Sequence, residues 1–518
     1  MTDIPAPQQA TTAQSGPLED RAGSPEAVSE ARGNRILQVL VAATFVVILN
    51  ETIMVNAIPR LMTEFDVTAR AAQWLSTAFM LTLAVVIPMT GWFLQRVTTR
   101  AAFTTAISLF LAGTVLATLS WTYPVLLVAR VVQASGTAVM MPLLMTTLLT
   151  IVPAERRGKT MGNVTLAMAV APALGPAVSG LLLQLGSWRW IFAVVLPIAG
   201  AMLLVGLRWL VDVGEPKPGS LDLVSVALAA LGFGVFVYGL SQIGADSSAG
   251  GLPAVPCIVV GLAFVAAFGW RQVRLQRSET PLLDLRTLRV RTFTISLALM
   301  CLSFMALMGV MITLPLFLQN VHGYSPLMTG LLLMPGGLVM GLLGPKVGSL
   351  FDQHGARVLV VPGSALLVAV LAGFATITQD SPAWWLLSLH VLMSVALAMI
   401  FTPVFTVGLG ALPMRLYSHG SAVLGTLQQV AAAMGTAIVI TVMSVRAASL
   451  VAHGTDQVAA LSAGIRWGMA FGAAVAVVVL VLAFFMPATA QSSTDGPDGP
   501  DEHAAPQDSA AEERVSVA

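Results

Sequence analysis

Apolar runs of about 20 residues recur from Ile36 to Met486, and they constrain the fold more than any other feature of the sequence. A helix of about 20 apolar residues is long enough to cross the hydrocarbon core of a bilayer. Charged residues make up only 10% of the 518 residues, against roughly 25% in ordinary soluble domains, and the mean hydropathy is +0.85. The sequence therefore predicts an all-α polytopic membrane protein.

The apolar runs predict 14 transmembrane helices, at 36–58, 71–93, 101–120, 124–148, 160–184, 190–210, 222–243, 252–270, 293–318, 326–346, 357–377, 383–409, 420–445 and 466–486. Lys and Arg accumulate in loops on the cytoplasmic side of a membrane. With the N-terminus inside, 20 of the 26 basic residues fall in inside segments and 5 in outside segments, while Arg130 falls within a span. We therefore expect a multi-pass protein of the cell (inner or cytoplasmic) membrane with both termini cytoplasmic.

A weak internal repeat divides the chain. The ten residues 91–100 and the ten residues 348–357 each begin with Gly, end with Arg and follow a predicted span at a cytoplasmic turn. Such pseudo-repeats are the usual build of secondary transporters. The predicted domains are a disordered N-terminal tail 1–35, a six-helix bundle 36–210, two inserted helices 211–270, a basic cytoplasmic linker 271–292, a second six-helix bundle 293–486 and a disordered acidic tail 487–518.

Glu51 and Arg130 are charged residues placed deep within predicted spans. An acidic side chain at the centre of a membrane helix costs about 2.5–3.5 kcal/mol on insertion scales, so such residues usually have a function. A rise of 1.5 Å per residue puts both residues roughly 12 Å below the outer surface. A carboxyl group in apolar surroundings favours its protonated form, and a nearby arginine opposes this. The pair therefore suggests proton coupling, and a static pair that only fixes helix packing is the alternative.

The second half of the chain has no matching charges. Met308 lies near the place equivalent to Glu51, and His390 lies near the place equivalent to Arg130. Proton coupling is therefore predicted in the first half, with His390 interpreted as a packing residue.

The fifth predicted span contains the sequence APALGPAVSG at residues 171–180. Pro172 and Pro176 lack backbone donors and favour a kink in the helix. Gly175 and Gly180 allow a neighbouring helix to approach closely. Such a helix can bend and seal against its counterpart, and a static kink is the alternative.

Several stretches resemble one transporter family. They are LNETIMVNAIP at 49–59, the turn 91–100, RVVQASGTAVMMP at 130–142, APALGPAVSG at 171–180, SWRWIF at 187–192, PLLDLRTLRVRTF at 281–293, LPLFLQNVHGYSP at 314–326 and HGSAVLGTLQQ at 419–429. Together they resemble the fourteen-span drug:proton antiporters of the major facilitator superfamily, especially lincomycin-resistance-type exporters. The resemblance covers about residues 35–486, and it implies a major facilitator fold.

The resemblance also implies roles for matching residues. Glu51 corresponds to a proton-linked acid, and Arg130 corresponds to a motif arginine. The antiporter motif would comprise Pro172, Gly175, Pro176 and Gly180, and the gating loops would comprise Gly91, Gln95, Arg96, Arg100, Gly348, Asp352 and Arg357. The first gating loop departs from the family, because Gln95 stands where the superfamily has an acid that Asp352 keeps in the second loop. Gln95 therefore offers only neutral hydrogen bonds.

Aromatic, thioether and amide side chains in the spans are candidates for a substrate cavity, because such surfaces adapt to varied lipophilic ligands. The candidates are Asn50, Gln133, Phe304, Met308, Phe317, Gln319, Gln428 and Gln429, and helix packing is the alternative for each. Cys257 and Cys301 both fall in apolar spans, which indicates neither a disulfide nor a metal site.

These observations predict a proton-coupled multidrug efflux antiporter that exports lipophilic or amphiphilic compounds by alternating access and is not an enzyme. The sequence lacks a GxxxxGK[ST] phosphate-binding loop, so the proton gradient rather than ATP or a cofactor is the expected energy source. The expected partners are lipophilic or cationic small molecules, protons and the bilayer, without nucleic acid, and the protein is expected to be a monomer. The alternatives are export of an endogenous metabolite, amino acid or antibiotic, or proton symport.

Overall fold

The computed structural model describes residues 30–67, 69–184, 186–212, 221–243, 252–278 and 280–487. Within these ranges 14 helices are long and apolar enough to cross a membrane, and no strand occurs. The predicted all-α class with 14 spans is confirmed. Most of the two predicted tails, namely residues 1–29 and 488–518, lies outside the described residues.

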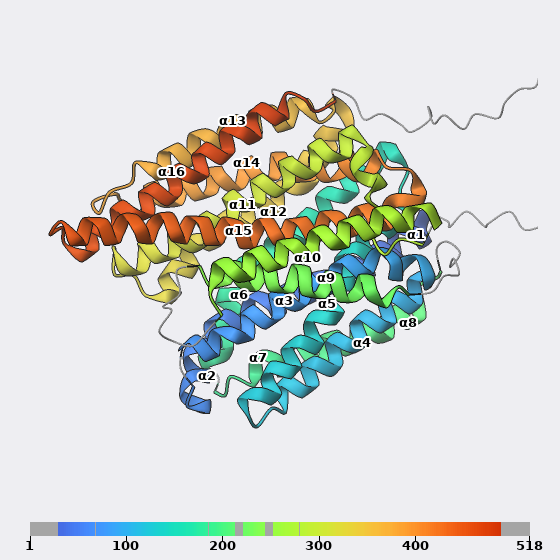
Figure 1. Cartoon of the computed structure of the whole chain (residues 1–518), viewed down its shortest axis with the longest axis horizontal. Helices are drawn as coiled ribbons and strands as arrows, with labels where there is room; N and C mark the ends of the chain where they lie inside the picture. The colour runs from blue at the N-terminus through green and yellow to red at the C-terminus, as the bar shows by residue number, and fades with distance from the viewer. Residues whose placement is uncertain are drawn as a thin grey trace, which may run out of the picture.

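The first half of the chain, as we call α1 to α8, forms six of the apolar spans (Figure 1). Its elements are α1 (Glu30–Ile53), η1 (Met54–Ala57), α2 (Ile58–Phe65), α3 (Ala69–Arg96), α4 (Thr99–Thr118), α5 (Tyr123–Ile151), η2 (Ala154–Arg156), α6 (Arg157–Gln184), α7 (Trp190–Ala193) and α8 (Val195–Trp209).

The remaining spans are the two intervening helices α9 and α10 and the helices α11 to α16. We call α11 to α16 the second half of the chain. The elements are α9 (Leu223–Ser241), α10 (Ala254–Leu275), η4 (Gln276–Ser278), η5 (Leu285–Arg289), α11 (Arg291–Asn320), α12 (Pro326–His354), α13 (Arg357–Ala375), α14 (Ala383–Gly410), η6 (Met414–Leu416), α15 (Tyr417–Ala452) and α16 (Gln457–Ala483). The grouping of the two halves into pseudo-repeat domains stays a prediction.

The first span differs from the predicted 36–58 at both ends. Helix α1 begins at Glu30, so residues 30–35 are helical rather than part of a tail, and it ends at Ile53. The chain then tightens into η1 and restarts as α2, which has a proline in its first turn. Proline has no amide hydrogen to bond the preceding turn, so an α-helix does not run undisturbed through that position. Glu51 therefore lies in the last turn of α1 and not in the middle of a longer helix.

The predicted linker 271–292 is partly helical, because α10 and η4 continue to Ser278. Gln272 is fully buried and holds the chain after η4 against α10, since its Oε1 accepts from the amides of Leu282 and Leu283 at 2.8 and 3.1 Å. Beside it the Arg271 guanidinium donates two hydrogen bonds to Asp222, at 2.7 and 2.8 Å. These bonds lower the pKa of Asp222 to about 2. The contacts join α9, α10 and the linker into one packed unit.

The two halves pack along α6 and α12 through glycines. A Cβ atom added to Gly162 would lie 2.3 Å from the carbonyl oxygen of Gly344, and one added to Gly348 would lie 2.1 Å from that of Gly158. The backbones therefore touch without side chains between them, which is how helices reach their closest approach in membranes. Helices α3 and α15 make a second contact, where Gly91 lies against His419.

Helix α1 begins and α16 ends at the same end of the bundle, on the right in Figure 1. We call this the terminal end. The contacts of Gly158 with Gly348 and of Gly91 with His419 lie near it, because α3 and α12 end there and α6 and α15 begin there. At the opposite end α2 and the last turns of α15 lie well apart (Figure 1).

We expect Gly162→Val to destabilise the protein, because the added side chain has no room against Gly344. Overpacking of this kind typically costs about 1–3 kcal/mol. The matched control is Gly200→Val, since a Cβ atom at Gly200 meets nothing within 4 Å. Thermal unfolding of the purified protein should show a lower Tm for Gly162→Val only. Equal Tm values would contradict the close packing of α6 on α12.

Candidate functional site

Glu51 lies in the last turn of α1, between two residues with different environments. Its side chain is partly buried. Asn50 before it is fully buried, and neither its Oδ1 nor its Nδ2 has a hydrogen-bond partner in the part of the chain that the structure describes. Thr52 after it donates to the carbonyl oxygens of Leu49 and Ile48, at 2.9 and 3.3 Å. An acid and an unpartnered amide therefore stand together at the end of α1.

Arg130 is buried on α5, with 1% of its surface exposed. Its Nη1 donates to Oε1 of Gln133 at 3.0 Å, and Nε2 of Gln133 donates to Oγ1 of Thr114 on α4 at 2.9 Å. The guanidinium carbon lies 4.2 Å from the ring centroid of Phe79 on α3. A cation over an aromatic face is attracted by the ring quadrupole. Three helices thus hold this charge through one hydrogen-bond chain and one ring.

Glu51 and Arg130 are near enough for their charges to act on each other. Within the described residues no hydrogen bond or ion pair joins them, and Nε of Arg130 has no partner. Removal of a carboxylate from a buried arginine without any replacement is costly. Gln133 and the ring of Phe79 therefore contact Arg130, and Thr114 supports Gln133, without a bond from the Glu51 carboxyl group.

The predicted antiporter motif packs directly on the end of α1. A Cβ atom added to Gly175 on α6 would lie 2.4 Å from Oγ1 of Thr52, the neighbour of Glu51. On another side α6 meets the second half, where a Cβ atom added to Gly337 would lie 2.4 Å from that of Ala173. Helix α6 runs without interruption past Pro172. Near its end, a Cβ atom added to Gly180 would lie 3.9 Å from Leu327 of α12. Helix α6 therefore connects the surroundings of Glu51 with the interface between the halves.

The first gating loop joins the halves by a neutral hydrogen bond. Nε2 of Gln95 donates to the carbonyl oxygen of Arg415 in η6 at 3.1 Å, and its Oε1 accepts from Nη1 of Arg96 at 3.1 Å. The guanidinium of Arg96 lies 5.2 Å from the Trp92 ring. The amide of Arg100 donates to Asp212 at 3.1 Å within the first half. Of these groups, Gln95 is the one that reaches across to the second half.

The second gating loop joins the halves by a charged group. Oδ1 of Asp352 accepts from the amide of Gly158 at 2.9 Å, and Oδ2 accepts from the amide of Lys159 at 2.8 Å. Both amides belong to the first turn of α6, where backbone donors lack partners within the helix and the helix dipole favours an anion. Arg357 is exposed at the start of α13. Asp352 of the second half therefore caps α6 of the first half.

Arg157 adds a contact at the terminal end that the sequence analysis missed. It donates to the carbonyl oxygens of Leu149 and Val152 at 2.8 and 3.1 Å, and it approaches the hydroxyl of Tyr417 on α15 at 3.4 Å. Basic side chains often cap helix ends in this way. The position of Arg157 just after the end of α5 is a signal for this role.

A cavity of about 80 Å³ lies between α3, α5, α14 and α15. We call it the amide cavity, and it is lined by Ile87, Met141, Pro142, Met145, Phe405, Leu409, Ser421, Leu424, Gly425, Gln428 and Gln429. Two of the predicted substrate-cavity residues, Gln428 and Gln429, therefore share one cavity.

The other candidates for the substrate cavity lie elsewhere. Phe304 lies 5.9 Å from Phe401 between ring centroids. Phe317 is fully buried with its ring 5.0 Å from that of His322. Met308 and Gln319 are partly buried on α11.

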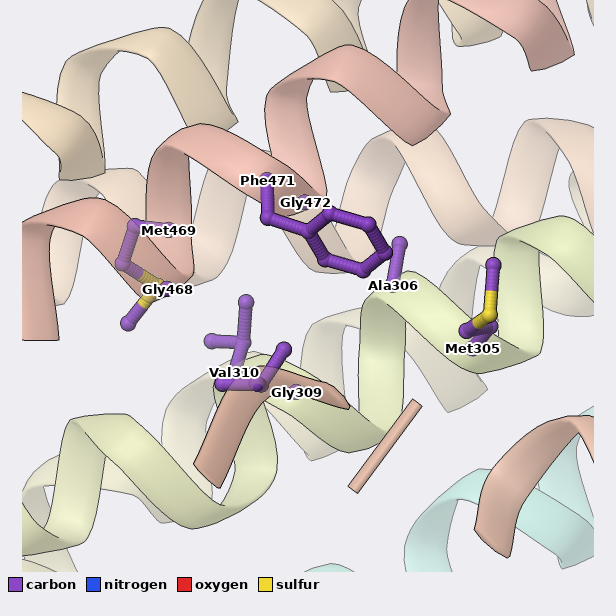
Figure 2. A pocket seen from close by; sticks show the side chains of 9 residues that line it. Met305, Ala306, Gly309, Val310, Gly468, Met469, Phe471 and Gly472 are labelled. Atoms are coloured by element: carbon purple, nitrogen blue, oxygen red, sulfur yellow. The ribbon is translucent and has the colours of Figure 1, made fainter. Parts of the chain in front are cut away.

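A second gap, between α11, α15 and α16, has a different character. Figure 2 shows Met305, Val310, Met469 and Phe471 around it, with glycines between them. It has no room for a water molecule. We interpret it as a seam of small residues between packed helices and not as a binding site.

Comparison with known proteins places the chain in a family. The family model of the Major Facilitator Superfamily matches residues 40–436. The chain belongs to the major facilitator superfamily. A lincomycin resistance protein of Listeria monocytogenes is 38% identical over 456 residues, which cover 87% of this chain and 96% of that protein. An uncharacterized transporter of the superfamily, YcnB of Bacillus subtilis, is 38% identical over 451 residues, which cover 87% and 94% of the two chains.

Solved structures agree with this family. The proton:xylose symporter XylE has a TM-score of 0.63 and 16% identity, with 89% of this chain and 98% of that chain covered. The human organic anion transporter MFSD10 has a TM-score of 0.61 and 14% identity, with 87% and 99% covered. These likenesses show the fold. The predicted membership of the superfamily is confirmed, and the chain is a multi-pass membrane transporter.

We expect Asp352→Ala to open the terminal end, because it removes both bonds to the first turn of α6. Loss of a helix cap costs about 0.5–2 kcal/mol. Pulsed electron spin resonance between nitroxide labels at the exposed positions Glu155→Cys and Val358→Cys, in a Cys257→Ser and Cys301→Ser background, should show a new population at longer distance.

The matched control for this prediction is Asp456→Ala. Asp456 caps α16 through the amides of Val458 and Ala459, within its own half. This variant should keep the distance distribution of the parent protein. If Asp352→Ala also keeps it, Asp352 does not hold the two halves together.

Proposed function

We propose that this transporter is a proton-coupled antiporter that exports lipophilic or amphiphilic compounds, antibiotics among them, by alternating access. The observation that carries the proposal is the placement of Glu51 close to Arg130 without a direct bond between them. The names of the relatives support the substrate class, since several are lincomycin resistance proteins.

Protonation of Glu51 changes the balance of charge around Arg130. While Glu51 is ionised, its charge offsets that of the guanidinium, whose direct partners are the neutral groups of Gln133 and Phe79. Once Glu51 is protonated, the arginine keeps only these neutral partners, and burial of a charge without a counter-charge is unfavourable. The two protonation states therefore favour different arrangements of α1 relative to α5.

Helix α6 passes such a movement to the interface. Gly175 rests on Thr52 beside Glu51, and Gly162 rests on Gly344 of α12. Because these contacts leave no space for side chains, a shift of the end of α1 displaces α6 against the second half. Proton binding and the packing of the two halves are thereby linked through one helix.

The terminal end is proposed to face the cytoplasm, in the cell membrane. Basic residues of described segments gather there, among them Arg96, Arg157 and Arg415, as expected for cytoplasmic segments. The contacts of Gln95 and Asp352 close this end, whereas at the opposite end α2 and the last turns of α15 lie well apart (Figure 1) and α6 stays near α12 at Gly180 and Leu327. The arrangement is therefore interpreted as an outward-facing state. The monomeric state stays a prediction.

The test is flux in proteoliposomes under an imposed pH gradient, with ethidium and lincomycin as probes. We expect Glu51→Gln to reduce gradient-driven transport by at least about ten-fold, because the amide cannot exchange a proton with the gradient. Exchange of labelled for unlabelled probe without a gradient should continue, since the substrate path is intact.

The control is Glu64→Gln. Glu64 is an exposed acid on α2 that forms an ion pair with Arg189, also partly exposed, at 3.2 Å. It should transport like the wild type. Unimpaired gradient-driven transport by Glu51→Gln would refute the assignment of proton coupling to Glu51.

A further inference from the structure

Three polar side chains of the amide cavity have no hydrogen-bond partner among the described residues. Ser421 is 4% exposed, and its Oγ is buried without a partner. Gln428 and Gln429 also line the cavity, and their amide groups form no hydrogen bond with any described residue. The spacing of seven and eight residues from Ser421 places all three on one face of α15.

Ser421 is the buried member of this group, and a buried hydroxyl without a hydrogen bond is unfavourable, so it needs a water or ligand partner. Gln428 and Gln429 are partly buried, and their amide groups are open to a molecule in the cavity. A volume of about 80 Å³ holds several waters. Each glutamine amide presents two donors and one acceptor oxygen, and Ser421 adds a hydroxyl. The cavity is therefore equipped to bind hydrogen-bonding groups of a molecule that enters it.

The remaining wall of the cavity is apolar and uncharged. Met141 and Met145 of α5 and Phe405 of α14 line it, and no Asp, Glu, Lys, Arg or His is among the lining residues. Methionine side chains adapt to ligands of different shape. The cavity thus offers hydrogen bonds without a charge to balance a cation.

The amide cavity is separate from the pair of Glu51 and Arg130. Met141 follows Arg130 by eleven residues on the continuous helix α5, a rise of about 16 Å. Near the terminal end the cavity meets the contact of α3 with α15, where a Cβ atom added to Gly425 would lie 3.2 Å from Ile87. A ligand in the cavity therefore does not share a side chain with the proton site.

An aromatic surface continues from the cavity. Phe401 precedes Phe405 by one turn of α14 and lies 5.9 Å from Phe304 of α11 between ring centroids. Sites for drug-sized ligands have volumes of about 300–1,000 Å³, far above that of the cavity. In this conformation the cavity therefore has room for one end of such a molecule. The rings of Phe401 and Phe304 lie beyond Phe405 of the cavity wall.

We propose that Ser421, Gln428 and Gln429 form a specificity site that binds an uncharged hydrogen-bonding group, a hydroxyl or an amide, of the exported compound. The site favours neutral amphiphiles over lipophilic cations that lack such groups. This inference rests on the proposed export function and narrows its substrate class.

The test is equilibrium binding to the purified protein in lipid nanodiscs. Chloramphenicol is a neutral probe with hydroxyl and amide groups, and tetraphenylphosphonium is a lipophilic cation that can form no hydrogen bond. The double variant Gln428→Met and Gln429→Met keeps side-chain length and removes both amides. We expect it to bind chloramphenicol about ten-fold more weakly, as loss of one or two hydrogen bonds predicts, and to bind tetraphenylphosphonium within two-fold of the wild type.

Two further variants make the result specific. Gln38→Met is the matched control, because Gln38 is exposed on α1 and outside the cavity; it should bind both probes as the wild type does. Ser421→Ala removes the smallest of the three groups, so it should weaken chloramphenicol binding less than the double variant, and retained tetraphenylphosphonium binding shows that the protein is folded.

Three results would overturn the proposal. They are unchanged chloramphenicol binding by the double variant, equal losses for both probes, and wild-type protein that does not bind chloramphenicol. Equilibrium binding needs no pH gradient. A failure of proton coupling would therefore appear in the flux assay with Glu51→Gln, and it would not affect the interpretation of the chloramphenicol binding measurement.

Discussion

A buried arginine whose direct contacts are neutral is the interaction on which the site depends. Arg130 is held by Gln133 and by the face of Phe79, and the charge of Glu51 acts on it without a bond. An isolated charge in apolar surroundings is strongly unfavourable. Helices α3, α4 and α5 therefore stay together around Arg130, and in the proposed mechanism Glu51 is the partner whose charge changes. A tight ion pair in this place would hold α1 fixed, whereas a separated pair lets the charge of Glu51 change.

The contacts at the terminal end are unequal, which bears on how that end opens. Asp352 accepts two backbone hydrogen bonds at the start of α6, while Gln95 donates one neutral bond to a carbonyl oxygen of η6. Hydrogen bonds to an ionised group are roughly twice as strong as neutral ones. Of these two gating-loop contacts, the one that Asp352 makes with α6 is therefore the stronger. The amide cavity lies between α3 and α15, where Ile87 packs against Gly425.

The sequence predicts what depends on composition and local pattern. The 14 spans follow from length and hydropathy, and Gln95 forms the neutral hydrogen bond that its side chain allows. The predicted depth of Glu51 assumed one helix to residue 58, but α1 ends at Ile53, and the chain passes through η1 before α2, whose first turn holds a proline. The partner Gln133 is one turn from Arg130 along the chain, whereas Phe79 and Thr114 come from other helices. Such partners depend on tertiary packing, which the sequence of one helix does not contain.

The central claim is that Glu51 exchanges a proton when a substrate binds. The most direct measurement is proton release from the purified protein into weak buffer near neutral pH on addition of ethidium, read with a pH-sensitive dye. The account predicts release of about one proton per bound molecule for the wild type, as expected when binding favours the ionised form of one group, and none for Glu51→Gln at equal ethidium occupancy. Equal release from both proteins, or none from the wild type, would contradict it.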